Sequence, residues 1–416
     1  MRVSVVLEHR FERTPDGRVW TDGPFPYTFF ARYLDVFDSV RVFARVRPAP
    51  EVRDGLRAAS GEAVSFFDVP YYHGVGRYLL QRRAIRRALA GGLAAEDPVV
   101  LRVPSQVAVD AAHVLEAQGR RFAAEVVGDP HDAFANGSFR HPLRPLLRWR
   151  HTRALVRMCR QAAATSYVTA EALQRRYPPA PGRVTTHYSS VELPDEAYVQ
   201  TPPPAPETAS RLISIGSMEH LYKGHDTLLE ALALCRHQGL DLSLTLVGDG
   251  LNRPWLQGKA DNLGLTGAVS FAGRAPSGQA VRDLLDQADL FVLASRQEGL
   301  PRALLEALAR GLPAVSTTVG GIPELLEPDV LVPPDNPWVL SELLRAVCSD
   351  RPKRDRMAAL GLAVAQRYHD RELGPRRRHF YQQIRRLAES GLMRISEGDD
   401  LSALKPCSKC ARDPQS

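Results

Sequence analysis

The sequence predicts an α/β protein with two doubly wound parallel sheets, and three observations support this fold class. Short apolar runs alternate with longer segments of helical periodicity along the chain. With 416 residues, the chain is too long for one ordinary core and suits two domains of about 200 residues each. Between them, residues 188–210 shift to proline and small polar residues, the composition of a semi-rigid linker.

Composition and charge narrow the class of protein further. Hydrophobic residues make up 44% and charged residues 24%, which is typical of a globular chain and excludes wholesale disorder. The net charge of +7 is modest for this length, so it accommodates an anionic ligand or surface without requiring one. The apolar start at residues 1–8 leads directly into charged sequence and predicts a first strand instead of a signal peptide. We therefore expect a cytoplasmic protein.

The amino-terminal half contains the elements of the first sheet. We expect helices at 28–37 and 74–90, and strands at 3–7, 40–46, 98–103 and 121–127. Two loops follow the carboxyl ends of strands, where open α/β sheets bind their ligands. One loop contains Gly23, and the other contains His131 and Asp132. Both loops are candidates for a functional site.

The stretch 140–160 contains seven arginines and no acid, with leucines and a tryptophan between them. This pattern predicts a basic amphipathic helix. One interpretation is a core helix with a solvated basic face, which we favour. The other is a helix that lies on an anionic membrane surface.

The carboxy-terminal half repeats the alternation. We expect strands at 211–215, 242–247, 269–273, 290–294 and 314–315, and helices at 225–236, 301–310, 337–350, 353–368 and 376–389. Beyond residue 390 the composition predicts a disordered tail. Cys407 and Cys410 in this tail have the spacing of half a zinc site, but no second pair completes it.

Two carboxylates lie on either side of a helix start in the stretch 288–319. Glu298 follows the apolar strand at 290–294, and Pro301 marks the beginning of a helix. Glu306 lies in the second turn among leucines and alanines, where a carboxylate needs a partner. The free N–H groups at such a helix start can bind a phosphate. The pattern alone leaves open whether these acids bind a ligand or are ordinary surface residues.

The run from Glu298 to Glu324 carries a resemblance to a known family. Its pattern E-G-L-P-x-x-x-x-E, followed by G-x-P and by G-G-x-P-E, resembles the sugar-donor signature of glycosyltransferase family 4. These are retaining enzymes of the GT-B fold, with two Rossmann-like domains facing each other across a cleft. The resemblance implies the following division: an acceptor domain at 1–195, a linker at 196–210, a nucleotide-sugar domain at 211–370, a helix crossing back at 371–390 and a disordered tail at 391–416.

The resemblance also assigns roles in binding the sugar donor. Glu306 would accept hydrogen bonds from the ribose hydroxyls, since one carboxylate offers two oxygens. Glu298, with the N–H groups of its neighbours, would hold the sugar and the diphosphate. Lys223 would stabilise the departing diphosphate. The complete set of sugar-donor residues is Ser217, Lys223, Arg274, Glu298, Gly299, Leu300, Pro301 and Glu306. Ser217 stands where many family members have arginine, and Arg274 would contact the base.

On the acceptor side, the family places a histidine or acid toward the transferred sugar and the acceptor hydroxyl. His131 is our candidate, followed by Asp132, while the loop at Gly23 would approach the phosphates and the acceptor. Together with Glu298 and Lys223, His131 forms the predicted catalytic set. Because the chain has no D-x-D pair to hold a divalent ion, we expect neither a metal nor another cofactor.

The expected reaction transfers N-acetylglucosamine or glucose from a UDP-sugar to an acceptor hydroxyl, with retention of configuration. The Ala- and Arg-rich composition resembles glycosyltransferases of aminoglycoside pathways, which implies a small aminocyclitol acceptor. The arginine stretch favours the alternative, a lipid-linked glycan or exopolysaccharide acceptor at the membrane. A sugar-nucleotide epimerase or phosphorylase would need a base or phosphate site that we do not find. A basic nucleic-acid-binding protein would need interleaved aromatic residues, which are scarce here.

Overall fold

The computed structural model describes residues 1–134, 142–191, 193–276 and 278–395. The first domain contains a nine-stranded sheet. Its parallel strands lie in the order β5-β3-β1-β6-β7-β8-β9, and the short β2 and β4 extend it in antiparallel fashion. The bounds are β1 Arg2–Arg13, β2 Val19–Thr21, β3 Ser39–Pro48, β4 Arg57–Ala58, β5 Val64–Val69, β6 Val99–Val103, β7 Ala123–Val126, β8 Ala164–Tyr167 and β9 Val184–His187.

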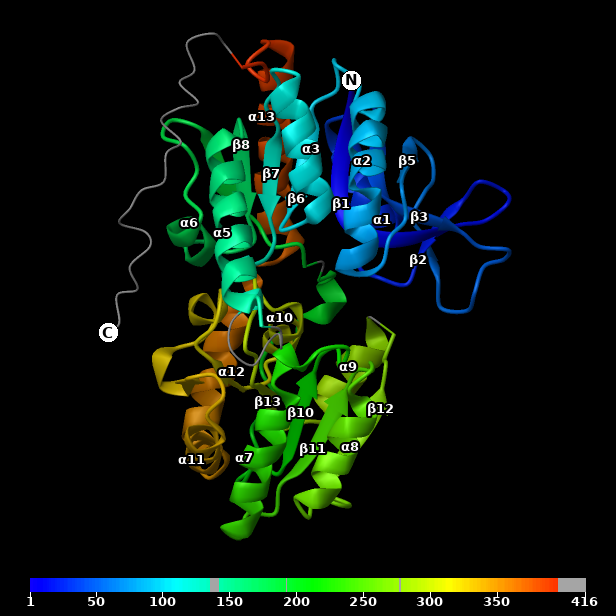
Figure 1. Ribbon diagram of the computed structural model, residues 1–416. Coiled ribbons are helices and arrows are strands. Elements are labelled where there is room, and N and C mark those ends of the chain that lie inside the picture. The colour runs from blue at the N-terminus through cyan, green and yellow to red at the C-terminus, as the bar shows by residue number, and fades with distance from the viewer. Residues whose placement is uncertain (135–141, 192, 277, 396–416) are drawn as a thin grey trace.

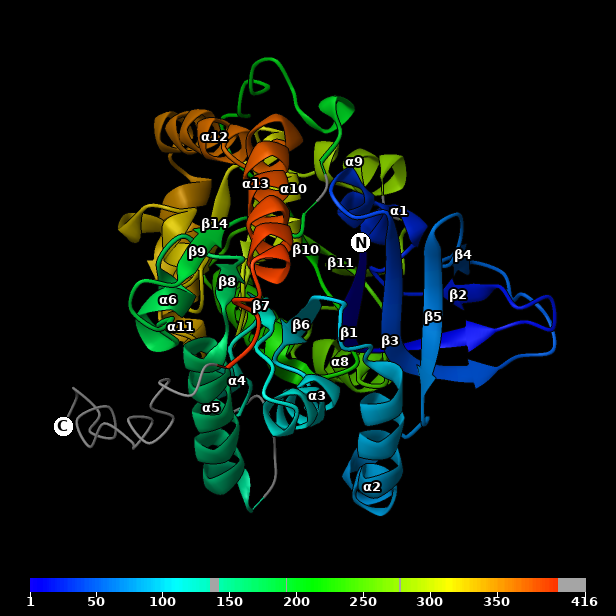
Figure 2. The same cartoon turned by 90° about the horizontal axis from the view of Figure 1, so that it is seen from above.

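Helices cover both faces of this sheet, as its apolar strands require (Figure 2). The helices are α1 Tyr27–Ala31, α2 Gly74–Gly92, α3 Gln106–Ala117, α4 Pro130–Ala133, α5 Arg144–Gln161 and α6 Ala172–Arg176. Helices α2, α3 and α5 lie on one face, with α3 between the other two, and α1 lies on the opposite face (Figures 1 and 2). The helix expected at 28–37 is shorter than predicted, because the chain tightens into a 3-10 helix, η1, at Arg32–Asp35.

The second domain contains a six-stranded, entirely parallel sheet in the order β12-β11-β10-β13-β14-β15. Its strands are β10 Arg211–Ile215, β11 Ser243–Val247, β12 Val269–Gly273, β13 Leu290–Leu293, β14 Ala314–Thr317 and β15 Leu331–Val332. Its helices are α7 His225–His237, α8 Arg253–Asn262, α9 Gln279–Asp286, α10 Arg302–Ala309, α11 Pro337–Cys348 and α12 Arg351–Gln366.

The central strand β13 shows why its sequence is an unbroken apolar run. Phe291 and Leu293 join the hydrophobic cluster under α10, which continues into the first domain. Leu290 and Val292 point the other way, into the cluster under α7 and α11. Because successive side chains of a strand alternate between its two faces, a strand covered by helices on both sides needs apolar residues at every position.

The last helix, α13 at Asp370–Glu389, leaves the second domain and packs on the first (Figure 1). Its Tyr381 stacks on Tyr33 with ring centroids 4.4 Å apart, and Arg385 donates a hydrogen bond to the Val36 carbonyl at 2.7 Å. The linker is also held against the second domain. The fully buried Arg354 of α12 donates hydrogen bonds to the carbonyls of Pro206 and Glu207. The two domains are therefore joined by more than a loose connection.

The tail predicted to start at residue 391 needs one correction. Residues 391–395 pack on the first domain, where the Met393 carbonyl accepts a hydrogen bond from Arg121 N at 2.7 Å and Ile395 N donates to the Gly119 carbonyl at 2.8 Å. Met393 is buried, and this apolar anchor was not apparent from the polar composition around it. The structure does not describe residues 396–416, which include Cys407 and Cys410. It also does not describe Arg140 of the predicted basic helix. No described helix is long and apolar enough to cross a membrane.

Candidate active site

The loop after β13 carries a buried ion pair. Lys223 Nζ lies 2.7 Å from a Glu298 carboxylate oxygen, and the Ser295 hydroxyl donates to the same oxygen at 2.7 Å. The side chains of Lys223 and Glu298 are only 14% and 8% exposed. Desolvation acts to lower the pKa of Lys223, but the Glu298 carboxylate outweighs it, so the pKa is raised and the ammonium stays charged. Lys223 and Glu298, the residues predicted to bind the diphosphate and the sugar, thus form one buried ion pair.

Close backbone approach at Gly224 brings this pair together. Lys223 ends the 3-10 helix η3, Leu221–Lys223, and Gly224 follows with φ at +66° before α7 begins. A Cβ atom on Gly224 would lie 1.8 Å from the carbonyl oxygen of Ala294 at the end of β13. Only glycine allows this combination of backbone conformation and contact.

The loop Glu298–Pro301 lies between two other loops. Gly321 N donates to the Gly299 carbonyl at 2.8 Å, and a Cβ on Gly320 would meet the Glu298 carbonyl at 2.0 Å. On the other side, a Cβ on Gly299 would lie 2.6 Å from the Val127 carbonyl in the first domain. The glycines therefore place the carboxyl end of β13 against the loop that follows β7. Leu300 and Pro301 are buried at the start of α10, as predicted for a helix entry.

Glu306 lies in the second turn of α10. Among the described residues its carboxylate makes no hydrogen bond or ion pair, although the side chain is half-buried. Desolvation raises its pKa, and the more distant Arg302 and Arg282 oppose this shift only in part. A desolvated carboxylate without a protein partner can accept hydrogen bonds from a ligand.

The other two predicted sugar-donor residues are exposed. Ser217 follows β10, and its hydroxyl accepts a hydrogen bond from Glu219 N at 3.2 Å. Arg274 follows β12, and its guanidinium has no partner within the described part of the chain. Both residues lie at the carboxyl ends of strands in the second sheet, the same edge that carries Lys223 and Glu298.

In the first domain, His131 lies within a polar network after β7. Its Nδ1 is 3.0 Å from Asp132, and its Nε2 is 2.6 Å from the Arg148 guanidinium of α5. The neutral imidazole with its proton on Nδ1 satisfies both contacts. Burial acts to raise the pKa of Asp132, but His131 and Arg176 outweigh it, so this pKa is lowered and the acid stays ionised.

Asp129 completes this network. Its carboxylate caps α4 by accepting a hydrogen bond from His131 N at 2.8 Å, and it also binds Arg176 and the Tyr177 hydroxyl. Asp129, His131 and Asp132 offer ligand atoms within 4.8 Å of one another, a spacing that a metal ion could use. The guanidinium of Arg176 already pairs with both acids, so this set is poorly suited to a cation. The expectation of metal-free chemistry remains a prediction.

The loop at Gly23 lies against another histidine. A Cβ on Gly23 would lie 2.3 Å from the His9 ring, whose Nε2 is 2.8 Å from the Thr21 hydroxyl. Burial lowers the pKa of His9 to about 4, so its ring is neutral near pH 7. Gly23 therefore allows the loop to pack closely against His9 of β1.

Several residues at the site were missed from the sequence. Arg148 was noted only as part of an arginine run, and Arg176 and Tyr177 not at all. Glu324 was noted only as part of a motif, yet its carboxylate links the two domains by accepting hydrogen bonds from three backbone N–H groups at 2.6–3.0 Å. These donors are Ala170, Glu171 and Ala172, at the start of α6. Such partners lie about 150 residues away in the chain, and no local spacing indicates them.

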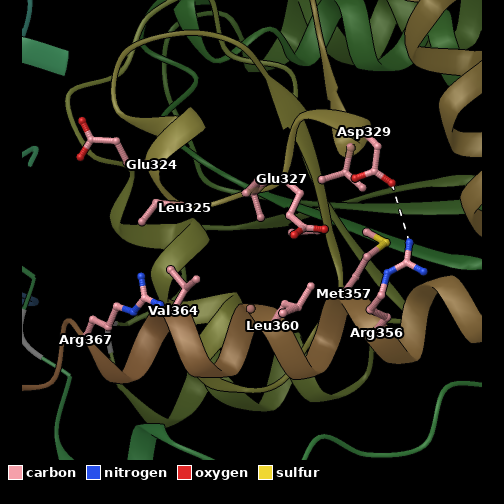
Figure 3. A pocket seen from close by; sticks show the side chains of 13 residues that line it. Glu324, Leu325, Glu327, Asp329, Arg356, Met357, Leu360, Val364 and Arg367 are labelled. Atoms are coloured by element: carbon pink, nitrogen blue, oxygen red, sulfur yellow. Dashed lines mark ion pairs between the residues drawn. The ribbon is translucent and has the colours of Figure 1, made fainter. Parts of the chain in front are cut away.

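A separate cavity of about 260 Å³ lies between the loop 324–330 and helix α12 (Figure 3). Leu325, Leu360 and Val364 contribute apolar surface, and the charged Arg356 and Asp329 lie at one end. None of the residues predicted for the active site lines this cavity. The chemistry is therefore better sought where the loops after β7 and β13 meet.

Comparison with known proteins relates part of the chain to a described family. Residues 200–361 match the family model described as Glycosyl transferases group 1, which includes Lys223, Glu298 and Glu306. Protein CapJ of Staphylococcus aureus is 25% identical over 336 residues, covering 80% of this chain and 83% of CapJ. The putative colanic acid biosynthesis glycosyltransferase WcaL of Escherichia coli is 36% identical over 157 residues, but this match covers only 35% of this chain and 37% of WcaL.

Solved structures support the architecture over the whole chain. Sucrose-phosphate synthase from Thermosynechococcus elongatus superposes with a TM-score of 0.69 at 16% identity, covering 92% of this chain and 99% of that structure. HepE from Anabaena, in complex with UDP and glucose, superposes with a TM-score of 0.61 at 18% identity, covering 93% of this chain and all of HepE. The fold is GT-B, which confirms the predicted fold class. The second domain is similar in sequence to the Glycosyl transferases group 1 model.

Proposed function

We propose that this protein transfers a sugar from a UDP-sugar to an acceptor hydroxyl with retention of the anomeric configuration. One observation carries the proposal: the paired Lys223 and Glu298 lie at the entry of α10, and the partnerless Glu306 lies on that helix. Lys223 and Glu298 lie at the carboxyl edge of the second sheet, the usual ligand-binding edge of α/β sheets, and Glu306 lies in the helix that follows. HepE, a structural neighbour, was solved with UDP and glucose, which supports UDP as the nucleotide.

In this proposal each residue of the second domain has a distinct task. Glu306 accepts hydrogen bonds from the ribose hydroxyls, which compensates its desolvation. The N–H groups of Gly299 and Leu300 and the start of α10 face the diphosphate. Lys223 supplies a fixed positive charge as the leaving diphosphate accumulates negative charge, and Glu298 both orients that ammonium and holds the sugar. This charge and the helix dipole replace a divalent metal.

His131 would act on the acceptor side. Its ring, held between Asp132 and Arg148, orients the acceptor hydroxyl or shields the developing positive charge on the sugar. Retaining glycoside hydrolases use a carboxylate nucleophile, but Asp129 and Asp132 are both engaged by Arg176. We therefore propose that the acceptor attacks from the front face and that the leaving phosphate assists its deprotonation.

For the acceptor, we propose a growing glycan instead of the small aminocyclitol first suggested by composition. WcaL, similar to about a third of this chain, is described as a putative colanic acid biosynthesis glycosyltransferase, and the relatives named above give the aminoglycoside interpretation no support. The sites of the positive charges agree with this choice. Arg148 and Arg176 balance the two carboxylates beside His131, so this network carries no excess negative charge that would attract a polycationic aminoglycoside.

We also propose that the first domain contacts the cytoplasmic face of a membrane, where lipid-linked glycans are found. Helix α5 exposes Leu143, Leu146 and Trp149 near its start and several arginines further along. Helix α2 repeats this polarity: its exposed Val75, Leu79 and Leu80 lie at its start, and arginines follow. Neither helix contains an acid. Apolar side chains beside arginines are typical of helices that lie in the interface of an anionic bilayer.

Two experiments test the proposed function. Sugar nucleotides should be screened with glycan, lipid-linked and aminocyclitol acceptors, and the anomeric configuration of the product read by NMR. We expect transfer from a UDP-sugar to a glycan with retention of configuration. Transfer only to an aminocyclitol would overturn the proposed acceptor, and an inverted product would overturn the proposed mechanism.

Co-sedimentation tests the membrane contact. It should show binding to phosphatidylglycerol vesicles that is lost in Leu80→Ser and Trp149→Ser. Equal binding by these variants would refute the membrane contact.

A further inference from the structure

Arg296 lies two residues before Glu298 in the loop after β13, but its side chain points into the start of α7. The side chain is only 8% exposed. Its guanidinium forms a bidentate ion pair with Asp226, with both N–O distances at 2.8 Å, and Nε donates to Asp335 at 2.6 Å. A further contact reaches the Thr227 hydroxyl at 3.2 Å. Three segments of the second domain, namely η3, the start of α7 and the loop at Asp335, therefore converge on this one cation.

One of these segments is η3, which carries Lys223. The Arg296 guanidinium donates to the Leu221 carbonyl, and the backbone N–H of Arg296 donates to the Tyr222 carbonyl at 2.7 Å. Both residues of η3 before Lys223 are thus held by Arg296. Glu298, the partner of Lys223, extends from the same loop as Arg296. Both partners of the buried ion pair are consequently attached to a single residue.

The geometry requires an arginine. Its planar fork reaches the two oxygens of Asp226 while Nε remains free for Asp335, an arrangement that a lysine ammonium cannot reproduce. Asp335 itself lies in the left-handed region with φ at +59°, which indicates that its loop is held in place by its contacts. Arg296 contacts neither the predicted diphosphate position nor Glu306, so no step proposed above uses it directly.

We infer that Arg296 is a positioning residue that fixes the separation and orientation of Lys223 and Glu298 for the diphosphate of the sugar donor. This inference rests on the proposed function, because it concerns the residue that would face the leaving group. Loss of the fork frees η3, and Lys223 then samples positions away from Glu298. Small displacements of a catalytic charge have large effects on rate.

Arg296→Lys and Arg296→Gln test this role, with Arg310→Lys as the matched control. Arg310 also forms a bidentate pair, with Asp286, through Nε at 2.7 Å and Nη2 at 2.8 Å, just after α10 ends. We expect Arg296→Lys to weaken UDP binding and lower kcat by about tenfold to a hundredfold each. Arg310→Lys should change the melting temperature by as much as Arg296→Lys does, but it should keep wild-type UDP affinity. Wild-type UDP affinity in Arg296→Lys, or an equal loss in both variants, would overturn the inference.

A second measurement needs no substrate. Brief acetic anhydride labelling, read by mass spectrometry, reports how accessible each lysine amine is, with Lys259 and Lys353 as internal references because both form ion pairs elsewhere. We expect Lys223 to label faster in Arg296→Gln than in the wild type, and the references to stay unchanged. If the wild type binds no UDP, the proposed function fails, while unchanged Lys223 labelling would refute the positioning role by itself.

Discussion

The two halves of the candidate site are built differently. In the second domain, Lys223 and Glu298 form one buried pair, and Glu306 on the adjoining helix has no partner among the residues that the structure describes. In the first domain, His131 is enclosed by Asp132, Arg148 and other polar side chains that already satisfy one another. The second domain thus offers a fixed charge and a carboxylate that is available to accept hydrogen bonds from a ligand. The first offers a saturated network whose proposed role is to orient the acceptor, and this difference predicts how variants should behave.

The largest effect is expected at Lys223. Lys223→Ala removes the positive charge that would face the leaving diphosphate and leaves Glu298 buried without its cation. We expect kcat to fall by about 10²- to 10³-fold, the usual loss for a residue that stabilises charge in a transition state. Steady-state kinetics with a UDP-sugar measures this. Wild-type turnover in the variant would remove Lys223 from the mechanism.

A smaller and different effect is expected at His131. His131→Ala leaves every contact of the second domain intact, so the KM for the sugar donor should stay unchanged. Transfer should fall by about 10²-fold, a typical loss for a side chain that positions or exchanges a proton with a reacting hydroxyl. Hydrolysis of the sugar donor without acceptor should be less affected. A raised KM for the sugar donor instead would show that the division of tasks is wrong.

Glu324 connects the two domains, and its substitution tests how much this connection contributes to transfer. Glu324→Gln keeps the shape but weakens three backbone hydrogen bonds to a carboxylate, each with a net contribution of about 1.5–3 kcal/mol at most. We expect a several-fold loss of transfer with unchanged UDP affinity, and a larger radius of gyration by small-angle scattering. An unchanged radius together with unchanged transfer would indicate that α13 and the linker alone hold the domains.

The remaining prediction concerns how stability, and not activity, depends on pH, and it applies to both domains. Burial lowers the pKa of His9 in the first domain and of His225 in the second to about 4, from 6.5. The folded state therefore binds fewer protons than the unfolded state between these values, so stability falls as pH falls from 6.5 toward 4. The loss should be on the order of a few kcal/mol for each histidine. Melting curves across this range test it, and a flat profile would contradict it.

The same contrast explains how much could be predicted from the sequence. The apolar run at 290–293 and the helix entry at Pro301 are local patterns, and a short motif connects Glu298 with Glu306. Lys223 was also found from its flanking glycine. These elements appear in the structure close to where the sequence predicts them, because each depends on neighbours within a few residues.

The remaining features depend on contacts between distant segments. Arg296 meets Asp226, and Glu324 meets the start of α6, across 70 and about 150 residues respectively. The first strand is longer than expected, at Arg2–Arg13, because its polar second half pairs with β3. The helix predicted at 28–37 ends early, where the chain tightens into η1 before β3. No spacing rule within the chain anticipates such tertiary effects.

The most direct test of the account is the binding of UDP by isothermal titration calorimetry to the wild type, Glu306→Ala and His131→Ala. Glu306→Ala removes two hydrogen bonds to a charged acceptor, so we expect UDP affinity to fall by about 10²-fold or more. His131→Ala should bind UDP as the wild type does, because its role lies on the acceptor side. Equal UDP affinity in Glu306→Ala and the wild type would contradict the assignment of the second domain as the nucleotide-sugar site.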